Sequence, residues 1–219
     1  FSIAVAPGSE LSVKAELGEH FLFWEWVTAL MGAALKVDPF NQPNVTEAKE
    51  ATSAVLKEWD NQLPALHPST TDEGVEIFGD GNTLIAALKN LIATTDSGGY
   101  IAIMAYLDRR DDVAIAELRS VFSEKSGRPV TFGWGPRFLH STGQFHKGGQ
   151  QNGSFLQITG STKSDFAVPG RDFSFATLLM AQAVGDFRAL GARKYPLLRL
   201  NLLERSAGIS QLLKAAKAL

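Results

Sequence analysis

A lysine near the beginning of a helix is the first residue of this chain whose position suits chemistry. Pro39 and Pro43 punctuate a turn. Asn44 then has the side chain to cap a new helix, and Glu47, three residues later, could reach back to it. Lys49 would lie in the first two turns, where the positive end of the helix dipole disfavours the ammonium form. Such a lysine can exchange protons; the alternative is an ordinary surface lysine.

A second group of ionisable side chains lies between residues 139 and 149. It holds His140, His146 and Lys147 together with hydroxyls and glycines. Glycines let backbone amides turn toward a ligand, and a lysine with imidazoles suits an anion such as a sugar phosphate. Arg137, just upstream, could bind phosphate or pair with an acid. We expect a ligand-binding loop in which an imidazole assists proton transfer; the alternative is a structural loop whose histidines hydrogen-bond neighbouring carbonyls.

The run from residue 40 to residue 49 resembles the C-terminal signature of the glucose-6-phosphate isomerases. That signature reads aromatic, Asn or Asp, Gln, any residue, Gly, Val, Glu, two variable residues and Lys. The matching positions are Phe40, Asn41, Gln42, Val45 and Lys49. Asn44 and Thr46 depart from it, because the family has Gly and Glu there. The segment 17–35 also looks like the helix that leads into this signature in bacterial members.

Much of the remaining chain is similar to one branch of that family, in which a transaldolase is fused to the isomerase. The similarity covers the long motif at 133–149 and the shorter segments 155–159 and 181–186. The first residue is Phe1 and not a methionine. We therefore expect the chain to be the C-terminal portion of such a fusion, without the main bodies of the two enzymes.

The resemblance implies interconversion of glucose 6-phosphate and fructose 6-phosphate. The family opens the sugar ring by acid–base catalysis and moves a proton between C2 and C1 through an enediol, with a glutamate as base. It gives Lys49 a role in ring opening. The other candidates are His140 and His146 for catalysis, and Gln42, Lys147 and Arg137 for substrate binding. No segment here matches the family's catalytic glutamate or phosphate pocket, so we expect residues 1–219 alone to be catalytically incomplete.

Composition narrows the classes of partner. Lys and Arg total 21 against 23 Asp and Glu, so no basic field points to nucleic acid. The absence of cysteine excludes disulfides and cysteine-based metal sites, and it weakly favours a cytoplasmic location. The longest apolar run, 21–35, is interrupted and too short to span a membrane. We expect a sugar phosphate partner, no metal and no cofactor, and a homodimer formed through the full-length enzyme, as the family implies.

The pattern of elements predicts an α/β (or α+β) chain in three parts. Residues 1–60 should end an isomerase domain, residues 61–82 should be a linker rich in turn residues, and residues 83–219 should form an additional α/β domain. The first part should contain a strand at 1–6, a buried helix at 14–35, and a helix at 46–59 with a stripe of Ala48, Ala51, Val55 and Trp59. The last should form a roughly four-stranded sheet from strands at 100–107, 130–133, 154–159 and 196–202, with helices at 83–94, 112–126, 174–192 and 209–219.

Two classes of function follow from these patterns. In the first, the chain is part of an enzyme: residues 1–60 complete an isomerase site and the later domain places the loop at 139–149 over it. In the second, the region from about Thr83 onward is a non-catalytic module that mediates dimerisation or docks the transaldolase half. The concentration of ionisable side chains at 139–149 favours the first class, since a docking surface does not require them in one loop.

Overall fold

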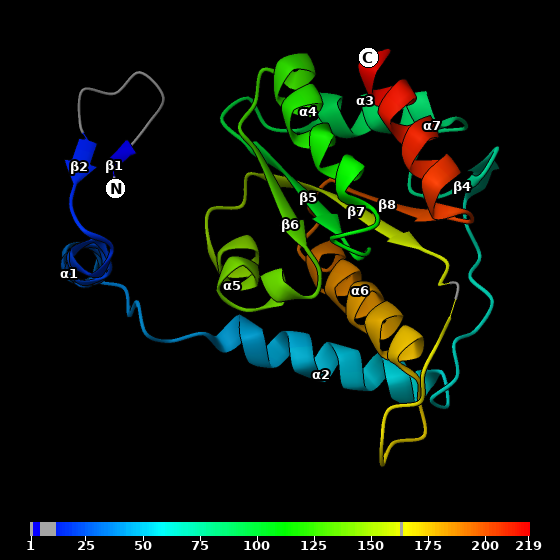
Figure 1. Ribbon diagram of the computed structural model, residues 1–219, viewed down its shortest axis with the longest axis horizontal. Coiled ribbons are helices and arrows are strands. Elements are labelled where there is room, and N and C mark those ends of the chain that lie inside the picture. Colours follow the sequence, from blue (N-terminus) through cyan, green and yellow to red (C-terminus); the bar gives the residue numbers. More distant parts are fainter. Residues whose placement is uncertain (1, 5–11, 163) are drawn as a thin grey trace. The chain divides into compact units, whose positions relative to one another are not determined.

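The computed structural model describes residues 2–4, 12–162 and 164–219. The chain forms two compact units, residues 1–41 and residues 42–219 (Figure 1). No helix among the described residues is long and apolar enough to cross a membrane. The boundary between the units falls before the second helix of the chain, and not near residue 60 as the sequence led us to expect.

The first unit consists of a short hairpin and one helix. Strand β1 (Ser2–Ala4) pairs antiparallel with β2 (Ser12–Lys14), and α1 (Leu17–Leu35) follows. The strand expected at 1–6 is therefore present at 2–4, and its other positions lie outside the described residues. At the start of α1 the Glu16 amide donates to the Glu19 carboxylate at 2.9 Å, which satisfies one free backbone group.

Helix α1 was expected to be buried, but most of it is exposed. Its apolar side chains point in all directions around the axis, and among the described residues of α1 only His20 and Gly32 are buried. The large apolar side chains left exposed are Leu17, Phe21, Leu22, Phe23, Trp26, Leu30, Met31 and Leu35. A two-stranded hairpin is too small to cover a helix that is apolar on every side.

The second unit is built on a six-stranded mixed sheet in the order β3-β4-β8-β7-β5-β6. The strands are β3 (Thr70–Asp72), β4 (Val75–Phe78), β5 (Tyr100–Ala105), β6 (Val130–Trp134), β7 (Gly153–Gly160) and β8 (Leu197–Leu202). The last four are parallel to one another, whereas β4 runs antiparallel to β8 and β3 antiparallel to β4. The α/β class and all four predicted strands are confirmed, but the sheet has two more strands than expected.

The two additional strands lie in the segment 61–82, which the sequence analysis assigned to a linker. Val75 and Ile77 are fully buried, while Glu76 between them is only partly so. This alternation is the mark of a strand with one face on a core. The linker prediction failed because each strand has only three or four residues between turn-forming ones.

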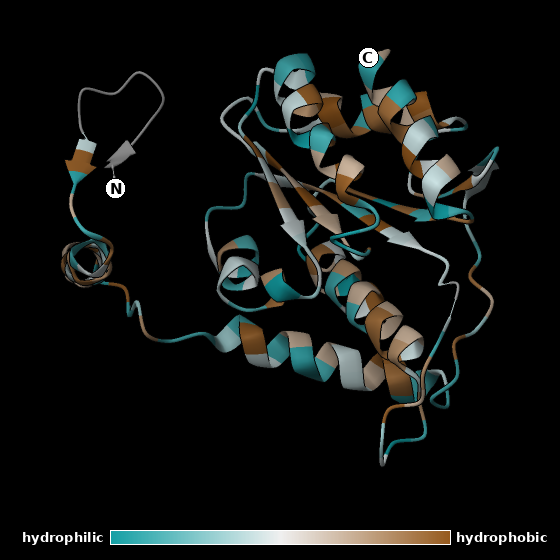
Figure 2. Ribbon diagram, in the orientation of Figure 1, coloured by the Kyte–Doolittle hydropathy of each residue, from teal (hydrophilic) through white to brown (hydrophobic). Residues whose placement is uncertain are grey.

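Helices cover both faces of the sheet (Figure 1). One face carries α3 (Leu84–Thr94), the 3₁₀ turn η1 (Val113–Glu117), α4 (Leu118–Ser126) and α7 (Arg205–Lys217). The other carries η2 (Arg137–Leu139), α5 (Ser141–Gly148) and α6 (Phe175–Gly191), with α2 (Pro43–Glu58) packed on the outside of α6. Figure 2 shows apolar residues along α3, α6 and α7, the helices that enclose the sheet. The predicted helices are present, except that the first part of the helix expected at 112–126 is the 3₁₀ turn η1, and α5 is an addition.

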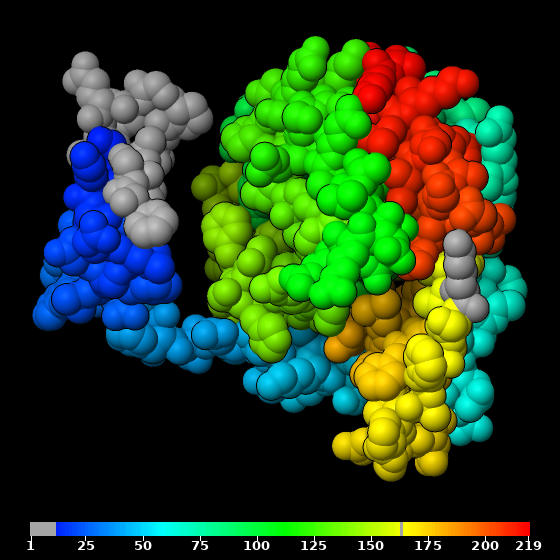
Figure 3. Space-filling view, viewed as in Figure 1, coloured from blue at the N-terminus to red at the C-terminus, as the bar shows by residue number. Residues whose placement is uncertain are grey.

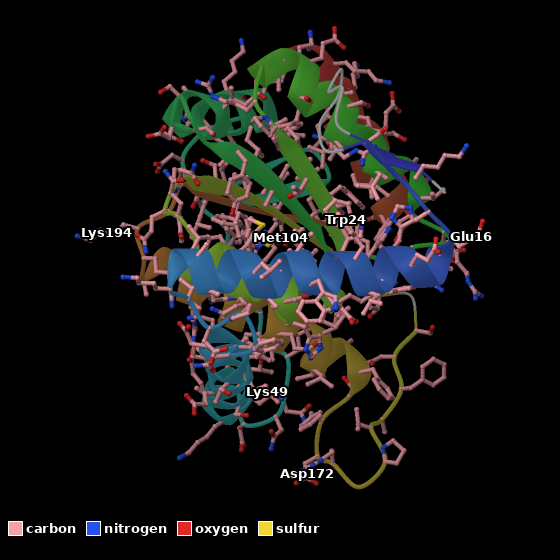
Figure 4. All side chains as sticks on the ribbon, turned by 90° about the vertical axis from the view of Figure 1, so that its left-hand side faces the viewer. Glu16, Trp24, Lys49, Met104, Asp172 and Lys194 are labelled. Carbon is pink, nitrogen blue, oxygen red and sulfur yellow. The ribbon has the colours of Figure 1, made fainter. Side chains whose placement is uncertain are left out.

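Alternation along the strands separates two cores. Ile101, Ile103 and Ile158 pack beneath α3, α4 and α7. Met104 and Phe155 point to the opposite face, where they meet α6 and η2; Figure 4 labels Met104. Because successive strand side chains point to opposite faces, a fully apolar strand can serve both layers at once.

Helix α2 packs on α6 through the stripe that the sequence predicted. Val55 is buried against Ala181 and Val184, and Trp59 packs at the edge of the same cluster. Ala48 is buried as well, and Ala51 partly so. This packing is the physical reason that α2 belongs to the second unit.

The connection from β7 to α6 forms a projecting loop. Residues 164–173 extend away from the body of the second unit in Figure 3, and Asp172 is labelled in this loop in Figure 4. The loop is tied to the start of α6, because the Asp165 carboxylate accepts from the Ala176 amide at 2.9 Å. Ser174 caps the helix by accepting from the Thr177 amide at 3.1 Å.

Candidate functional site

Three of the predicted site residues meet in one cavity of about 360 Å³. Lys49 comes from α2, whereas Arg137 and His140 come from η2 and its C-terminal end. Polar Thr52 and Gln182 also line the cavity, and its apolar lining is Val45, Ala48, Pro136 and Leu139. Lys49, Arg137 and His140 are all exposed, so each can reach a ligand from solvent. Figure 4 labels Lys49 on α2.

The N-terminal part of α2 is anchored by side chains that the sequence analysis assigned differently. Pro43 occupies the first turn and Gln42 the N-cap position, so Asn44 is not the cap. A proline fits there because its missing N–H would have no partner in the helix. Asn44 instead forms two hydrogen bonds with Gln144 of α5. The backbone N–H of Asn44 donates to Gln144 Oε1 at 2.9 Å, and Gln144 Nε2 donates to Asn44 Oδ1 at 2.8 Å.

A bidentate ion pair holds the same turn of α2 to the end of α6. Both guanidinium NH₂ groups of Arg193 donate to the Glu47 carboxylate, at 2.7 and 2.8 Å. The Asn44 side-chain amide donates to the same carboxylate at 2.7 Å. The Arg193 hydrogen bond is the main reason that the pKa of Glu47 lies below its ordinary value. The backbone of α2 is therefore held in place at Glu47, two residues before Lys49.

The other cationic wall of the cavity is fixed by a buried aromatic anchor. Phe138 and Leu139 are buried, and the Phe138 ring stands edge-on to Tyr106 at 5.2 Å. Arg137 and His140, on either side of this pair, are left at the surface. Gly135 allows the backbone before η2 to lie close to the Tyr106 ring, since a Cβ at this position would be only 2.7 Å from that ring.

The side chains that line the cavity have the chemistry to bind an anion. Its lining contains a lysine, an arginine and a histidine and no carboxylate. A guanidinium and an ammonium form charge-assisted hydrogen bonds with phosphate oxygens, and an imidazole can give or take a proton. Among the described residues, no group of three or more His, Cys, Asp or Glu is placed to hold a metal ion.

The segment 139–149 is not the open loop that the sequence predicted, because most of it is helix α5. His140 remains outside the helix and lines the cavity. His146 and Lys147 lie in its last turn and are buried. The helical rotation turns them toward the sheet and α6, so the structure does not bring them together with His140.

Lys147 forms a buried ion pair with Asp186 of α6. The Lys147 ammonium donates to Asp186 Oδ1 at 2.5 Å, and the two side chains are 1% and 2% exposed. Burial raises the pKa of the Asp186 carboxyl, an effect that the Lys147 charge opposes. The Arg193 guanidinium also donates to the Lys147 carbonyl at 3.2 Å. In this position Lys147 holds α5 to α6 and cannot contact a ligand from solvent, contrary to the predicted role in substrate binding.

His146 is likewise part of the interior. Its ring lies 4.9 Å from that of Phe155 and 6.2 Å from that of Tyr100. Burial, together with the nearby Lys147 charge, lowers the pKa of His146 to about 4. The imidazole is therefore neutral at pH 7 and enclosed by aromatic rings, which does not fit the catalytic role predicted for it.

Gln42 lies at the N-cap position of α2, is exposed and is not among the residues that line the cavity. Two polar lining residues, Thr52 and Gln182, were not predicted. Thr52 falls between Ala48 and Val55 on the predicted apolar stripe of α2, so the helical spacing could have indicated it. Gln182, in contrast, carries no local signal, because only the packing of α6 on α2 places it at the cavity.

Comparisons with known proteins do not assign a family to this chain. No family model matches it, and no curated protein matches it. Among solved structures it is similar to the crystal structure of a hypothetical protein from Thermus thermophilus, at 18% sequence identity and a TM-score of 0.49. The match covers 60% of this chain and 36% of that one, so this chain corresponds to little more than a third of that protein.

Proposed function

We propose that this chain is the C-terminal part of an aldose–ketose isomerase that interconverts glucose 6-phosphate and fructose 6-phosphate, fused in its parent to a transaldolase. The observation that supports this most is the cavity that collects Lys49, Arg137 and His140 from two distant segments without a carboxylate. The resemblance to phosphoglucose isomerases gives Lys49 a role, and Arg137 and His140 are candidates because of their residue types. Cytoplasmic location and assembly into a homodimer through the whole enzyme belong to the same proposal.

In this proposal the residues of the cavity divide the work. Arg137 binds the phosphate, since its planar guanidinium can engage two phosphate oxygens at once. Lys49 and His140 serve ring opening, in which one group protonates the ring oxygen and another removes a proton from the anomeric hydroxyl. The apolar lining from Ala48 and Leu139 strengthens these interactions by excluding water from part of the cavity.

The same proposal treats the chain as catalytically incomplete. Transfer of a proton between C2 and C1 requires a base, and no carboxylate lines the cavity. The resemblance puts that glutamate in a part of the enzyme with no counterpart in residues 1–219. The isolated chain should therefore bind the sugar phosphate without turning it over.

The test is a titration of the full chain with fructose 6-phosphate, followed by amide chemical shifts, next to a coupled assay for glucose 6-phosphate formation. We expect saturable shifts in residues 45–52 and 136–140 and no turnover. Lys49→Met should weaken binding about tenfold, the scale of one charge-assisted hydrogen bond. Lys57→Met, in the last turn of the same helix, is the matched control and should leave binding unchanged. Absence of saturable binding, or equal effects of the two substitutions, would refute the proposal.

A second candidate function is a non-catalytic docking or dimerisation module. It is favoured by α1, whose apolar residues, among them Phe21 and Trp26, are exposed in the described part of the first unit. Sedimentation of the chain separates the two functions. If Phe21→Glu converts a dimer to a monomer while fructose 6-phosphate fails to bind, the docking function is the better description.

A further inference from the structure

A second cavity, of about 250 Å³, lies at the carboxyl ends of the parallel strands. Tyr106 directly follows β5, Thr159 and Gly160 end β7, and Asn201 lies near the end of β8; all of them line this cavity. The chain leaves β5 toward α4 on one face and leaves β7 toward α6 on the other. In open α/β sheets, ligands bind where neighbouring strands diverge in this way.

The floor of this cavity is a chain of hydrogen bonds across three strands. The Thr159 hydroxyl lies 2.9 Å from Asn201 Oδ1, and Asn201 Nδ2 donates to Glu76 Oε2 at 2.7 Å. The strand register sets this order, because Thr159 is paired with Asn201 and Asn201 with Glu76. Thr159 and Asn201 are both buried. Both the oxygen and the nitrogen of the Asn201 side-chain amide are thus hydrogen-bonded, and the series of hydrogen bonds ends on the Glu76 carboxylate at the cavity.

Glu76 is the one charged residue among those that line this cavity. Among the described residues no lysine or arginine nitrogen lies within ion-pair distance of it. Arg199 is near enough to interact with Glu76 through its charge, but its guanidinium lies over the Phe78 ring, 3.8 Å from the centroid. A carboxylate that lines a cavity without a hydrogen-bonded cation favours a positively charged ligand.

The remaining walls determine the rest of the ligand. Apolar side chains face the cavity from three segments: Leu63, Leu66, Leu179, Met180 and Leu203. Tyr106 adds a buried hydroxyl that has no hydrogen-bond partner among the described residues. One acidic group, one unpartnered hydroxyl and apolar walls suit a small molecule with a cationic head and a short apolar body.

We propose that this cavity is a binding site for a small organic cation, a primary ammonium carried on a short alkyl chain. The ammonium donates to Glu76, and the alkyl part packs against Leu179 and Met180. This site is separate from the cavity around Lys49, has the opposite charge, and does not depend on the isomerase proposal.

The test is a titration of the full chain with n-butylammonium, 1-butanol and butyrate, which share a four-carbon chain and differ in charge. We expect saturable shifts of the amides at 159–162 and 201 with n-butylammonium, with a dissociation constant on the order of millimolar for so small a ligand. 1-Butanol should bind at least tenfold more weakly, about the difference between a charged and a neutral hydrogen bond. Butyrate should not bind.

Matched substitutions complete the experiment. Glu76→Gln should weaken n-butylammonium binding at least tenfold, whereas Glu73→Gln, which removes a charge from the turn of the same hairpin, should not. Ser161→Trp at the lining should block the site and Ser164→Trp nearby should leave it open, which keeps the test valid if Glu76→Gln unfolds the chain. Lack of saturable binding, equal affinity for 1-butanol, or insensitivity to Ser161→Trp would overturn the proposal.

Discussion

The two ends of the segment 136–148 carry the same types of side chain in opposite environments. At its start, Arg137 and His140 are exposed around a cavity that they share with Lys49. At its end, His146 and Lys147 are buried, one among aromatic rings and the other against Asp186. A few residues of helix between them rotate the second pair from solvent to the interior.

This difference teaches that the charge of a side chain does not by itself identify a binding site. An exposed cation keeps its hydration and can exchange it for a ligand's oxygens. A buried cation must have a permanent partner, because leaving it unpaired costs several kcal/mol. The cavity end of the segment is therefore available for binding, and the buried end holds α5 and α6 together.

The largest effect should come from breaking the buried pair. Asp186→Asn leaves the Lys147 ammonium without its counter-charge in the interior, which should lower the free energy of unfolding by about 3–5 kcal/mol. Urea denaturation measures this loss. The double substitution Lys147→Met with Asp186→Leu should lose much less free energy of unfolding than Lys147→Met and Asp186→Leu lose in total when made separately, since both charges are then gone. Additive losses would contradict the assignment of a coupled pair.

The next largest effect is a loss of stability in acid. The pKa of His146 is about 4 in the folded chain, against an ordinary value of 6.5. Between these two pH values the unfolded chain binds a proton that the folded chain does not, so stability falls as the pH falls. The difference between the two pKa values corresponds to a loss of about 3 kcal/mol in the free energy of unfolding. Above pH 6.5 His146 contributes no pH dependence.

The comparison with His146→Phe isolates this contribution from the carboxylates that titrate nearby. Phenylalanine suits the aromatic surroundings, and the variant should lose less stability than the parent between pH 6.5 and pH 4. Identical pH profiles of urea midpoints for parent and variant would show that the imidazole is not buried in its neutral form.

A smaller effect should follow from Glu47→Gln. The pair with Arg193 is bidentate but partly exposed, with side chains 36% and 21% accessible. We expect a loss of about 1 kcal/mol in the free energy of unfolding, and weaker fructose 6-phosphate binding because the turn that carries Lys49 is less firmly held. Glu58→Gln breaks the exposed pair with Arg188 and is the control, expected to change neither quantity; a loss equal to that of Glu47→Gln would contradict this account.

The smallest effect on stability should come from the cavity itself. Lys49→Met and Arg137→Met alter exposed side chains that form no ion pair among the described residues. The free energy of unfolding, measured by thermal denaturation, should change by no more than about 0.5 kcal/mol, while affinity for fructose 6-phosphate falls. A large destabilisation by either substitution would indicate that the cavity is structural.

Local pattern predicted the parts of the fold that carry their own signal. Strand β5 is a continuous apolar run, β7 carries the apolar Phe155, Leu156 and Ile158, and α2 shows its stripe through Ala48 and Val55. The short strand β4 escaped notice because four residues between turns carry too little pattern. The exposure of α1 could not be predicted, because apolar composition indicates a need for cover and does not say whether the chain supplies it.

The site was predicted to a similar extent. Lys49, Arg137 and His140 were identified by residue type and by resemblance, and the packing of α2 on α6 brought them together. Lys147 was assigned to ligand binding because its partner Asp186 lies far away in the sequence and only tertiary packing unites them. Gln182 was missed for the same reason, since nothing in its own neighbourhood marks it.

The most direct test of the contrast between the two ends of this segment is site-resolved acetylation of lysines, measured by mass spectrometry with and without fructose 6-phosphate. We predict that Lys49 is modified readily and is protected by the sugar phosphate, whereas Lys147 is unreactive in both conditions until the chain unfolds. Ready modification of Lys147 in the folded chain, or a Lys49 that fructose 6-phosphate does not protect, would contradict the account.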